Sequence, residues 1–300
     1  MKKEDQAKSI ASKLSKISRS TGINYQSIST TFLLERLLAR LVANGKLSKS
    51  LVFKGGYVGL RVYNSNRYTV DLDALLVKAD IPSILKQTAK AIQTDTGDGA
   101  WFVLESQMDL KTQGEYGGVR QIYRSGIGEI PQDIKRAQII NFDLGIGDPV
   151  TPGPVKVKTD ELIGDETLSW QVYPIETIIA EKLQTLIVRG DDNSRAKDVF
   201  DLHHYLPEAD RKIFLAAVKS CFEFRETPLP ENINQVLSSM DRTMLERGWK
   251  TATASLKSPP TFNEAFKSIL KELDRLLPSN VGKKRKPQQS QRSSQRRAKK

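Results

Sequence analysis

The stretch FKGGYVGLRVYNSNRYTVDLDALLV, residues 53 to 77, decides the fold that we expect of this chain. A short apolar run ends in a pair of glycines, and a second apolar run carries Asp71 and Asp73 at alternate positions. Side chains two residues apart on a β-strand point to the same side of the sheet. The spacing therefore predicts that the two carboxylates project together, while Leu72 points the opposite way.

Carboxylates in an apolar strand require positive charge beside them, because burying an unpaired charge is expensive. A hard divalent cation, Mg²⁺ or Mn²⁺, is the natural partner, and Mg²⁺ prefers carboxylates together with phosphate oxygens. Asp143, inside the apolar run RAQIINFDLGI (136–146), is the expected third carboxylate. The pattern predicts a metal site at Asp71, Asp73 and Asp143, suited to phosphoryl or nucleotidyl transfer. A strand end that faces solvent is the alternative.

The glycine pair lies between a predicted strand, 51–54, and a helical turn. Glycines at the start of a helix let backbone N–H groups approach an anion, and the helix N-terminus favours negative charge. Gly55 and Gly56 are therefore expected to hold the triphosphate of an NTP that the metal ions also contact. Taken alone, a glycine pair often makes only a turn.

Lys182 lies in the middle of an apolar stripe at helical spacing, in the segment IETIIAEKLQTLIVR (175–189). A lysine in that position either extends along the stripe to water or faces an interior anion. We expect the second arrangement, because a triphosphate site is predicted nearby.

Arg195 and Asp198 are three residues apart at the start of another predicted helix. Such a pair is often a structural ion pair. Directed at the site, Arg195 could instead bind phosphate through two guanidinium nitrogens, and Asp198 could orient a lysine or the incoming hydroxyl. Asp201 is expected to project farther outward.

The order of predicted elements places strands in the first part of the chain and helices in the second. Sequence patterns predict strands at 51–54, 69–77, 101–107, 119–125 and 136–146, and helices at 81–93, 174–189, 195–206, 209–223 and 263–277. Strands mixed with helices, followed by a helical block, indicate an α+β fold. We expect a first domain over 1–165, with helices at its N-terminus, and a helical domain over 166–280.

The composition is that of an ordinary globular protein, with 38% hydrophobic and 27% charged residues. No apolar stretch approaches the roughly 18 residues that a membrane span needs, and the N-terminus lacks a signal-peptide pattern. The single cysteine, Cys221, excludes an intramolecular disulfide and a cysteine-cluster metal site. We therefore expect a cytoplasmic protein without a membrane partner.

The formal net charge of +12 is concentrated at the C-terminus. Residues 281–300, VGKKRKPQQSQRSSQRRAKK, contain nine Lys or Arg and no acidic residue. Because it lacks apolar periodicity, this basic tail is expected to be disordered. Its charge suits a polyanion, RNA or DNA, although a tail that only improves solubility would have the same composition.

Together, the glycine pair, the Asp-x-Asp strand and the later carboxylate resemble the opening motif of the polymerase-β-like nucleotidyltransferases. Within that superfamily the chain is most similar to the AbiEii/AbiGii toxins, the toxin half of type IV toxin–antitoxin and abortive-infection systems. The segments LLERLLARL (33–41), IETIIAEKLQTLIVR (175–189) and RAKDVFDLHHY (195–205) also fit, and the resemblance covers roughly residues 25 to 210. It implies a nucleotidyltransferase domain over 1–165, and a cognate antitoxin or repressor as partner.

The resemblance assigns roles to individual residues. It implies that Asp71 and Asp73 are catalytic metal ligands, with Asp143 as the third carboxylate or its support. Lys182 would contact the nucleotide phosphates and act in catalysis with Asp198. The remaining residues of the expected nucleotide-binding set are Lys54, Gly55, Gly56, Arg67, Arg195 and Lys197.

One residue departs from the superfamily pattern. Ser or Thr usually follows the glycine and hydrogen-bonds a phosphate, whereas Tyr57 follows Gly56 in this chain. Either backbone amides make the phosphate contact here, or nucleotide binding is altered.

The leading expectation is a Mg²⁺-dependent enzyme that transfers NMP from an NTP to an RNA acceptor, by the resemblance the tRNA 3′ end, and thereby halts growth. The same site would also serve AMPylation or phosphorylation of protein hydroxyls. A third alternative is a relative that has lost catalysis and binds RNA or a protein partner. The departure at Tyr57 keeps that third alternative open.

Overall fold

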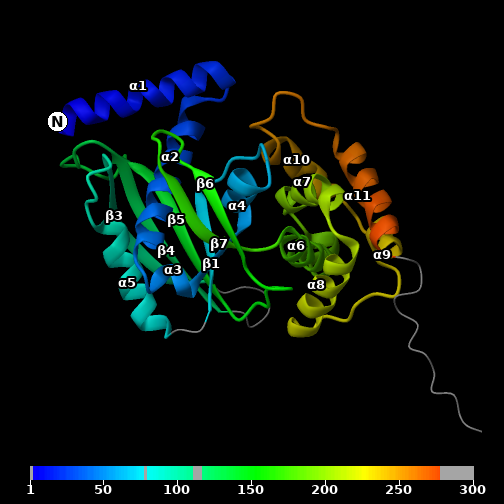
Figure 1. The fold of residues 1–300 in the computed structure, drawn as a ribbon. Coiled ribbons are helices and arrows are strands. Elements are labelled where there is room, and N and C mark those ends of the chain that lie inside the picture. The colour runs from blue at the N-terminus through cyan, green and yellow to red at the C-terminus, as the bar shows by residue number, and fades with distance from the viewer. Residues whose placement is uncertain (1–2, 78–79, 111–116, 278–300) are drawn as a thin grey trace, which may run out of the picture.

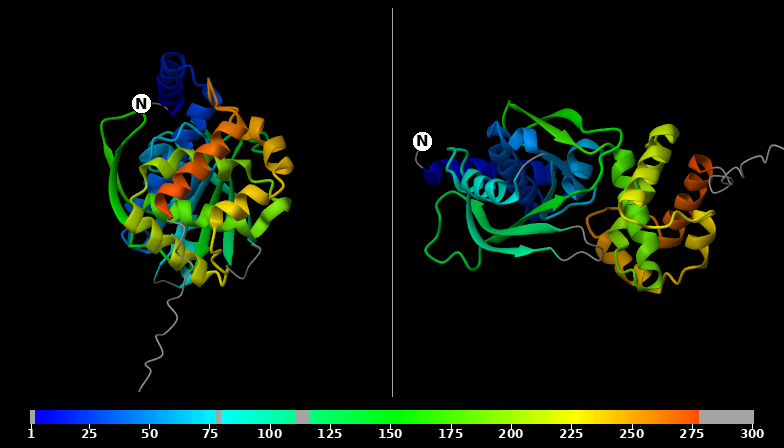
Figure 2. Two further views of the ribbon diagram at one scale, coloured as in Figure 1. Left: turned by 90° about the vertical axis from the view of Figure 1, so that its right-hand side faces the viewer. Right: turned by 90° about the horizontal axis from the view of Figure 1, so that it is seen from below.

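The computed structural model describes residues 3–77, 80–110 and 117–277. A strand-rich lobe built on one sheet lies beside a lobe made of helices (Figure 1). The view from below shows the same division, with the sheet on one side and the helices on the other (Figure 2). This arrangement confirms the α+β fold. The predicted disordered tail, 281–300, lies outside the described residues.

The strand-rich lobe contains a seven-stranded sheet, counted over the described residues, in the order β3-β4-β5-β2-β1-β7-β6. The strands are β1 (Leu51–Lys54), β2 (Asp71–Leu76), β3 (Ala100–Asp109), β4 (Gly118–Ile127), β5 (Gln138–Ile146), β6 (Val155–Asp160) and β7 (Thr167–Val172). β2 is antiparallel to β1 and parallel to β5, so the sheet is mixed. The sequence predicts β1 to β5 but does not predict β6 and β7.

Helices of the same lobe cover the sheet. They are α1 (Lys3–Thr21), α2 (Tyr25–Ala43), α3 (Leu47–Ser50), α4 (Gly55–Val62) and α5 (Ile81–Gln93). Most of α2 is buried, because it packs against α1 and α5 as well as against the sheet. Asn24 is the N-cap of α2, and its side chain accepts a hydrogen bond from the backbone N–H of Ser27 at 2.8 Å.

The helical lobe follows β7. Its elements are α6 (Ile175–Arg189), α7 (Ala196–Tyr205), α8 (Arg211–Phe224), α9 (Ile233–Ser239), α10 (Thr243–Ala252) and α11 (Phe262–Leu276). The sequence predicts α6, α7, α8 and α11 within a few residues of their bounds, but not α9 and α10. Over the described ranges, no helix has the length and apolarity to cross a bilayer.

The boundary between the lobes lies later than predicted. A division at residue 165 would assign β7 to the helical lobe, yet β7 pairs with β1 and β6 in the sheet. Its last residue, Val172, is fully buried. The strand-rich lobe therefore extends through β7, and the helical lobe begins at α6. Pairing between strands far apart in sequence decides this boundary, and composition does not reveal it.

Tyr205 on α7 contacts the strand-rich lobe at α4. Gly59 lies so near Tyr205 that a Cβ at residue 59 would collide with the hydroxyl oxygen. The ring of Tyr63, the residue that follows α4, packs edge-on against the same tyrosine with 6.2 Å between ring centroids. The buried hydrophobic side chains of the two lobes form one continuous core. Well-packed elements therefore frame the space between the lobes.

Candidate active site

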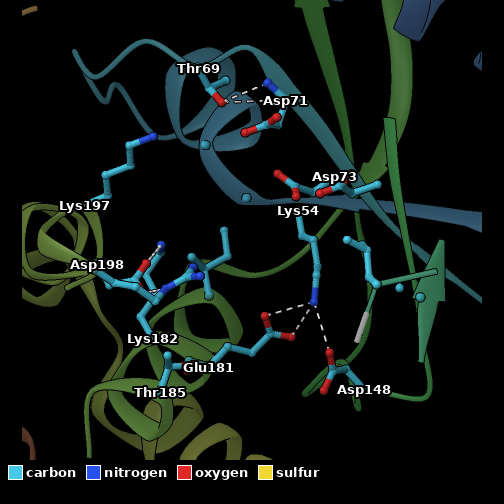
Figure 3. Close-up of a pocket in the computed structure, with 18 of the residues that line it drawn as sticks. Lys54, Thr69, Asp71, Asp73, Asp148, Glu181, Lys182, Thr185, Lys197 and Asp198 are labelled. Carbon is cyan, nitrogen blue, oxygen red and sulfur yellow. Dashed lines mark hydrogen bonds and ion pairs between the residues drawn. The ribbon is translucent and has the colours of Figure 1, made fainter. Parts of the chain in front are cut away.

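A cavity of about 770 Å³ lies between the sheet and the helical lobe. Figure 3 shows side chains from β2, α6 and α7 pointing into it. All residues predicted for the site line this cavity: Lys54, Gly55, Gly56, Arg67, Asp71, Asp73, Asp143, Lys182, Arg195, Lys197 and Asp198. Segments far apart in sequence thus converge as expected.

Strand register places four charged side chains in one row on the cavity side of the sheet. Asp73 on β2 is the partner of Asp143 on β5, and Asp143 is the partner of Arg120 on β4. On the other side of Asp73, its partner on β1 is Lys54. Cross-strand partners face the same side of a sheet, so these four side chains share one face. Leu72 is fully buried on the opposite face, as the alternation predicts.

Asp73 has the most strongly perturbed carboxyl group of this row. Among the described residues, its carboxylate makes no hydrogen bond or ion pair. Burial raises the pKa of Asp73 to about 7, and the negative charges of Asp143 and Asp71 add to the effect. A carboxyl group in this situation gains more than its neighbours from a cation placed beside it.

Asp71 faces the same side of the strand in more polar surroundings. Its Oδ1 accepts a hydrogen bond from the side-chain amide of Asn141 at 2.8 Å. Its backbone N–H donates to the hydroxyl of Thr69 at 3.1 Å. These contacts fix the orientation of Asp71, and its Oδ2 has no partner within the described part of the chain. Asp71 and Asp73 can therefore offer oxygen atoms to one shared cation.

The glycine pair lies directly against these carboxylates. Gly55 begins α4 with φ of 76°, in the left-handed region, and a Cβ there would collide with Oδ2 of Asp73. At Gly56, a Cβ would lie 3.2 Å from Thr69 Cβ and 3.2 Å from Arg67 Nη2. The lack of a side chain is therefore required at Gly55, where the backbone at the start of α4 approaches the carboxylate pair.

The side chain of Tyr57, at the sequence position of the usual serine or threonine, does not point into the cavity. Its side chain is fully buried in the core, where its ring centroid lies 6.1 Å from that of Trp170, and it does not line the cavity. Burial raises the pKa of its hydroxyl far above the ordinary value. A different hydroxyl, that of Thr69, lies on the cavity side, 3.4 Å from where a Cβ on Gly56 would be.

Lys182 on α6 is turned inward, as expected, and meets two carboxylates. Its Nζ lies 2.7 Å from Asp198 Oδ1 and 2.7 Å from Asp201 Oδ2. Burial lowers the pKa of Lys182, but these two carboxylates outweigh burial and hold the pKa above its ordinary value. The ammonium group therefore stays charged, and the anions that it contacts in this structure are aspartates.

Asp198 connects Lys182 to the residue that precedes α7. Arg195 Nε donates to Asp198 Oδ2 at 2.5 Å, which is the ion pair expected from their spacing. Burial raises the pKa of Asp198, but the charges of Lys182 and Arg195 outweigh it and hold the pKa well below its usual range. The side chain of Arg195 is 52% exposed, so it is accessible to a second anion. Exposed Lys197 extends toward the strand side of the cavity (Figure 3).

Asp201 does not project outward, and that prediction is wrong. It is fully buried, and it accepts two hydrogen bonds from Arg67, at 2.9 and 2.8 Å, besides its ion pair with Lys182. The reason is that α7 is buried on two faces, one apolar and one that carries Asp198 and Asp201. Arg67, predicted to bind nucleotide, lines the cavity as a buried partner of Asp201.

Lys54 is held by two acids at one end of the cavity. Its Nζ lies 2.9 Å from Glu181 and 3.1 Å from Asp148 (Figure 3). Arg225 from the helical lobe contacts the same Asp148 at 3.0 Å. Burial lowers the pKa of Lys54, but the charge of Glu181 and those of its other neighbours hold it well above the ordinary value. The predicted contact of Lys54 with nucleotide would therefore require its release from these acids.

Asp143 stands beside Asp71 and Asp73, but its oxygens are already bonded. Arg120 donates to Asp143 from Nε at 2.7 Å and from Nη2 at 2.6 Å. Within the described ranges, no group of three or more Asp, Glu, His or Cys side chains has the arrangement of a metal site. Asp71 and Asp73 by themselves fit the donor set of Mg²⁺, which uses one or two carboxylates with water and substrate phosphates.

Sequence reasoning did not select Thr69, Arg120, Glu181 or Arg225, which also line the cavity. A signal for Arg120 exists, because the alternation of β4 buries Gln121 and Tyr123 on one face and leaves Arg120 on the other. That signal does not reveal which strand lies next to β4.

Solved structures resemble this fold. JHP933 from Helicobacter pylori superposes with a TM-score of 0.50 at 17% identity, over 85% of this chain and 93% of that protein. Another Helicobacter pylori structure, described as a nucleotidyltransferase, gives a TM-score of 0.51 at 17% identity, over 85% of this chain and 96% of the other. A search among curated proteins gives no match.

The sequence matches a protein-family profile over residues 36–272. The family is described as nucleotidyl transferase AbiEii toxin, type IV toxin–antitoxin system. The matched segment begins within α2 and ends within α11, so it includes the sheet, the helical lobe and the cavity between them. This chain therefore belongs to the AbiEii family of nucleotidyltransferase toxins of type IV toxin–antitoxin systems.

Proposed function

We propose that this toxin uses Mg²⁺ to transfer NMP from an NTP to a hydroxyl of RNA, with the tRNA 3′ end as the leading acceptor. The acceptor oxygen would bond to the α-phosphorus of the NTP. The bond between that phosphorus and the oxygen that bridges the α- and β-phosphates would break. Pyrophosphate would leave, and the hydroxyl would lose its proton. The observation that carries the proposal is the carboxylate pair, Asp71 and Asp73, which lies against the glycine pair and faces cations across one cavity.

The divalent cation, Mg²⁺ or Mn²⁺, would be held by Asp71 and Asp73. Bound there, such a cation would neutralise phosphate charge and polarise the phosphoryl group. Asp73 suits this role because its carboxylate has no partner in the described part of the chain and its pKa lies at about 7. Asn141 keeps Asp71 oriented toward the same place.

The triphosphate would lie between the start of α4 and the helical lobe. On the strand side, the backbone N–H groups of the glycine pair and the hydroxyl of Thr69 would donate to phosphate oxygens. On the helical side, Lys197 is exposed, and the exposed Arg195 uses only Nε for its bond to Asp198, so its terminal guanidinium nitrogens can reach phosphate oxygens. Lys182 would act from a fixed position, because Asp198 and Asp201 hold its ammonium group, and from there its charge acts on Asp73 across the cavity.

An RNA acceptor suits the charge around the cavity. Arg189, from the last turn of α6, lines the cavity together with Arg195 and Lys197. Grouped cations of this kind can follow a nucleic-acid backbone. The basic residues of 281–300 would extend this attraction. An antitoxin that covers the group would block the enzyme, and the RNA substrate would place its action in the cytoplasm.

Labelled NTPs test the proposal. The protein is incubated with total tRNA, Mg²⁺ and each NTP labelled in turn at its α- or its γ-phosphate. We expect label from the α-phosphate in RNA, none from the γ-phosphate, and none in EDTA or with Asp71→Ala. The matched control, Asp165→Ala, changes an exposed aspartate outside the cavity and should keep full activity.

The other outcomes of this experiment separate the alternatives. Label from the α-phosphate in protein would indicate AMPylation, and label from the γ-phosphate in protein would indicate phosphorylation. Absence of transfer with every NTP, by a protein that binds tRNA, would overturn the proposal.

A further inference from the structure

Arg120 lies where it can determine how many metal ions the carboxylates accept. It comes from β4 and is the register partner of Asp143 on β5. Besides its two hydrogen bonds to Asp143, its Nη2 lies 4.0 Å from Oδ1 of Asp71. The guanidinium group therefore contacts one predicted metal ligand and lies near another.

The pairing between Arg120 and Asp143 has a strong geometry. Two parallel N–H···O bonds between a guanidinium group and a carboxylate are the strongest common arrangement of these side chains. The side chain of Asp143 is only 13% exposed, so little water competes for its oxygens. The hydrogen bond to Asp143 also raises the pKa of Arg120, which keeps the guanidinium group charged. Asp143 therefore has a permanent cation as its partner before any metal ion arrives.

The charges of this group match one divalent cation. Asp71, Asp73 and Asp143 bring three negative charges when all are ionised, and Arg120 brings one positive charge, which leaves a net charge of −2. One divalent cation neutralises that charge. A second would be repelled by Arg120 as well as by the first cation. The formal charges of Lys54 and Arg225 are balanced by Glu181 and Asp148, so they are left out of this count, although Lys54 also attracts the carboxylate of Asp73.

We propose that Arg120 keeps Asp143 out of metal coordination, so that the nucleotide-free enzyme binds one divalent cation, between Asp71 and Asp73. A second cation would need the oxygens of Asp143 as ligands, and Arg120 already bonds both of them. In this arrangement Asp143 is a positioning residue, which holds the guanidinium group beside the site. The inference rests on the proposed metal-dependent function and adds to it the number of ions and the role of Arg120.

Binding of Mn²⁺ to the protein without nucleotide tests this inference, with free Mn²⁺ followed by electron paramagnetic resonance. The wild type should bind one ion. Arg120→Gln should bind two ions, or one ion at least about tenfold more tightly, because a repelling charge is removed. Arg124→Gln is the matched control: Arg124 lies on the same strand, pairs with Glu105 and does not line the cavity, so this variant should match the wild type.

A double variant, Arg120→Gln with Asp143→Asn, decides whether Asp143 is a ligand. It replaces the ion pair by two uncharged amides and leaves the net charge of the group unchanged. We expect one Mn²⁺ bound with an affinity within a few-fold of the wild type. Circular dichroism checks the fold of each variant, and the double variant decides alone if Arg120→Gln does not fold.

Three results would overturn the inference: two ions in the wild type, equal binding by the wild type and a folded Arg120→Gln, or loss of the ion in the folded double variant. These results are distinct from failure of the proposed function. An enzyme that binds one ion and transfers no nucleotide would keep the inference and overturn that function. An enzyme that binds two ions and transfers nucleotide would do the reverse.

Discussion

Replacing Asp73 by asparagine should stabilise the metal-free protein at neutral and alkaline pH, although it should abolish transfer. Asparagine keeps the shape of the side chain and removes the charge that its surroundings oppose. In the folded protein, burial and the nearby charges of Asp143 and Asp71 raise the pKa of Asp73 to about 7. An ionised Asp73 therefore destabilises the wild-type protein until a cation binds.

The size and direction of this effect follow from proton binding. An aspartate in the unfolded chain has a pKa of about 3.9, so it is ionised above roughly pH 4, while folded Asp73 keeps its proton up to about pH 7. The folded state binds more protons in this range, so stability falls as pH rises from about 4 to about 7. A difference of about 3 pKa units corresponds to roughly 4 kcal/mol, fully present above pH 7. The asparagine side chain does not titrate, so the variant lacks this loss of stability.

Urea unfolding in EDTA, followed by circular dichroism, measures this difference. The free energy of unfolding of Asp73→Asn should be close to that of the wild type at pH 4.5 and higher by up to about 4 kcal/mol at pH 8. Addition of Mg²⁺ at pH 8 should stabilise the wild type and leave Asp73→Asn unchanged. Asp165→Asn, at an exposed position, is the control and should stay within about 0.5 kcal/mol of the wild type at each pH.

A single result would refute this reasoning. If folded Asp73→Asn is no more stable than the wild type at pH 8 in EDTA, then the charge of Asp73 does not destabilise the folded protein. The cavity would then already supply the positive charge that we assign to a metal ion.

Four further changes have defined outcomes. Asp201→Asn should lower the free energy of unfolding by about 3–5 kcal/mol in urea, because Lys182 and Arg67 lose a buried counter-charge; a cost under about 1 kcal/mol would show that water reaches this cluster. Thr69→Val should raise the KM for NTP about tenfold in steady-state assays and leave the Tm nearly unchanged, as expected for one hydrogen bond to a charged group; an unchanged KM would exclude contact with phosphate. Gly55→Ala should abolish Mn²⁺ binding without unfolding the protein, because the new methyl group would displace the carboxylate of Asp73; normal binding would show that the backbone can shift. Deletion of 281–300 should weaken tRNA binding and flatten its salt dependence; identical binding curves would remove the tail from RNA recognition.

Local periodicity is sufficient to predict much of the site. Alternation along β2 predicts that Asp71 and Asp73 share a face, and the apolar stripe of α6 predicts that Lys182 is turned inward. Each of these predictions needs only the geometry of one strand or one helix. The position of the glycine pair between β1 and α4 is equally local, but its requirement for space is not, because a Cβ at Gly55 would meet Asp73 on β2.

Pairings between distant segments limit the prediction elsewhere. Asp143 is found next to Asp73, but only the register between β4 and β5 reveals that Arg120 reaches Asp143 first. The prediction that Asp201 faces outward assumes that the apolar stripe of α7 is the only buried face of this helix. The second buried face exists because Arg67 from the loop before β2 and Lys182 from α6 both contact it. Such partners are decided by tertiary contacts, which no single segment encodes.

The two walls of the cavity have opposite excess charge, and this favours a metal–nucleotide complex over either component alone. On the sheet side, Arg120 neutralises Asp143, and the remaining negative charge comes from Asp71 and, above about pH 7, from Asp73. On the helical side, Arg195 and Lys197 present positive charge. A bare triphosphate would satisfy the helical wall but face two carboxylates, and a bare cation would leave the helical wall without an anion. Since only the complex satisfies both walls, each ligand must raise the affinity of the protein for the other, and by the same factor.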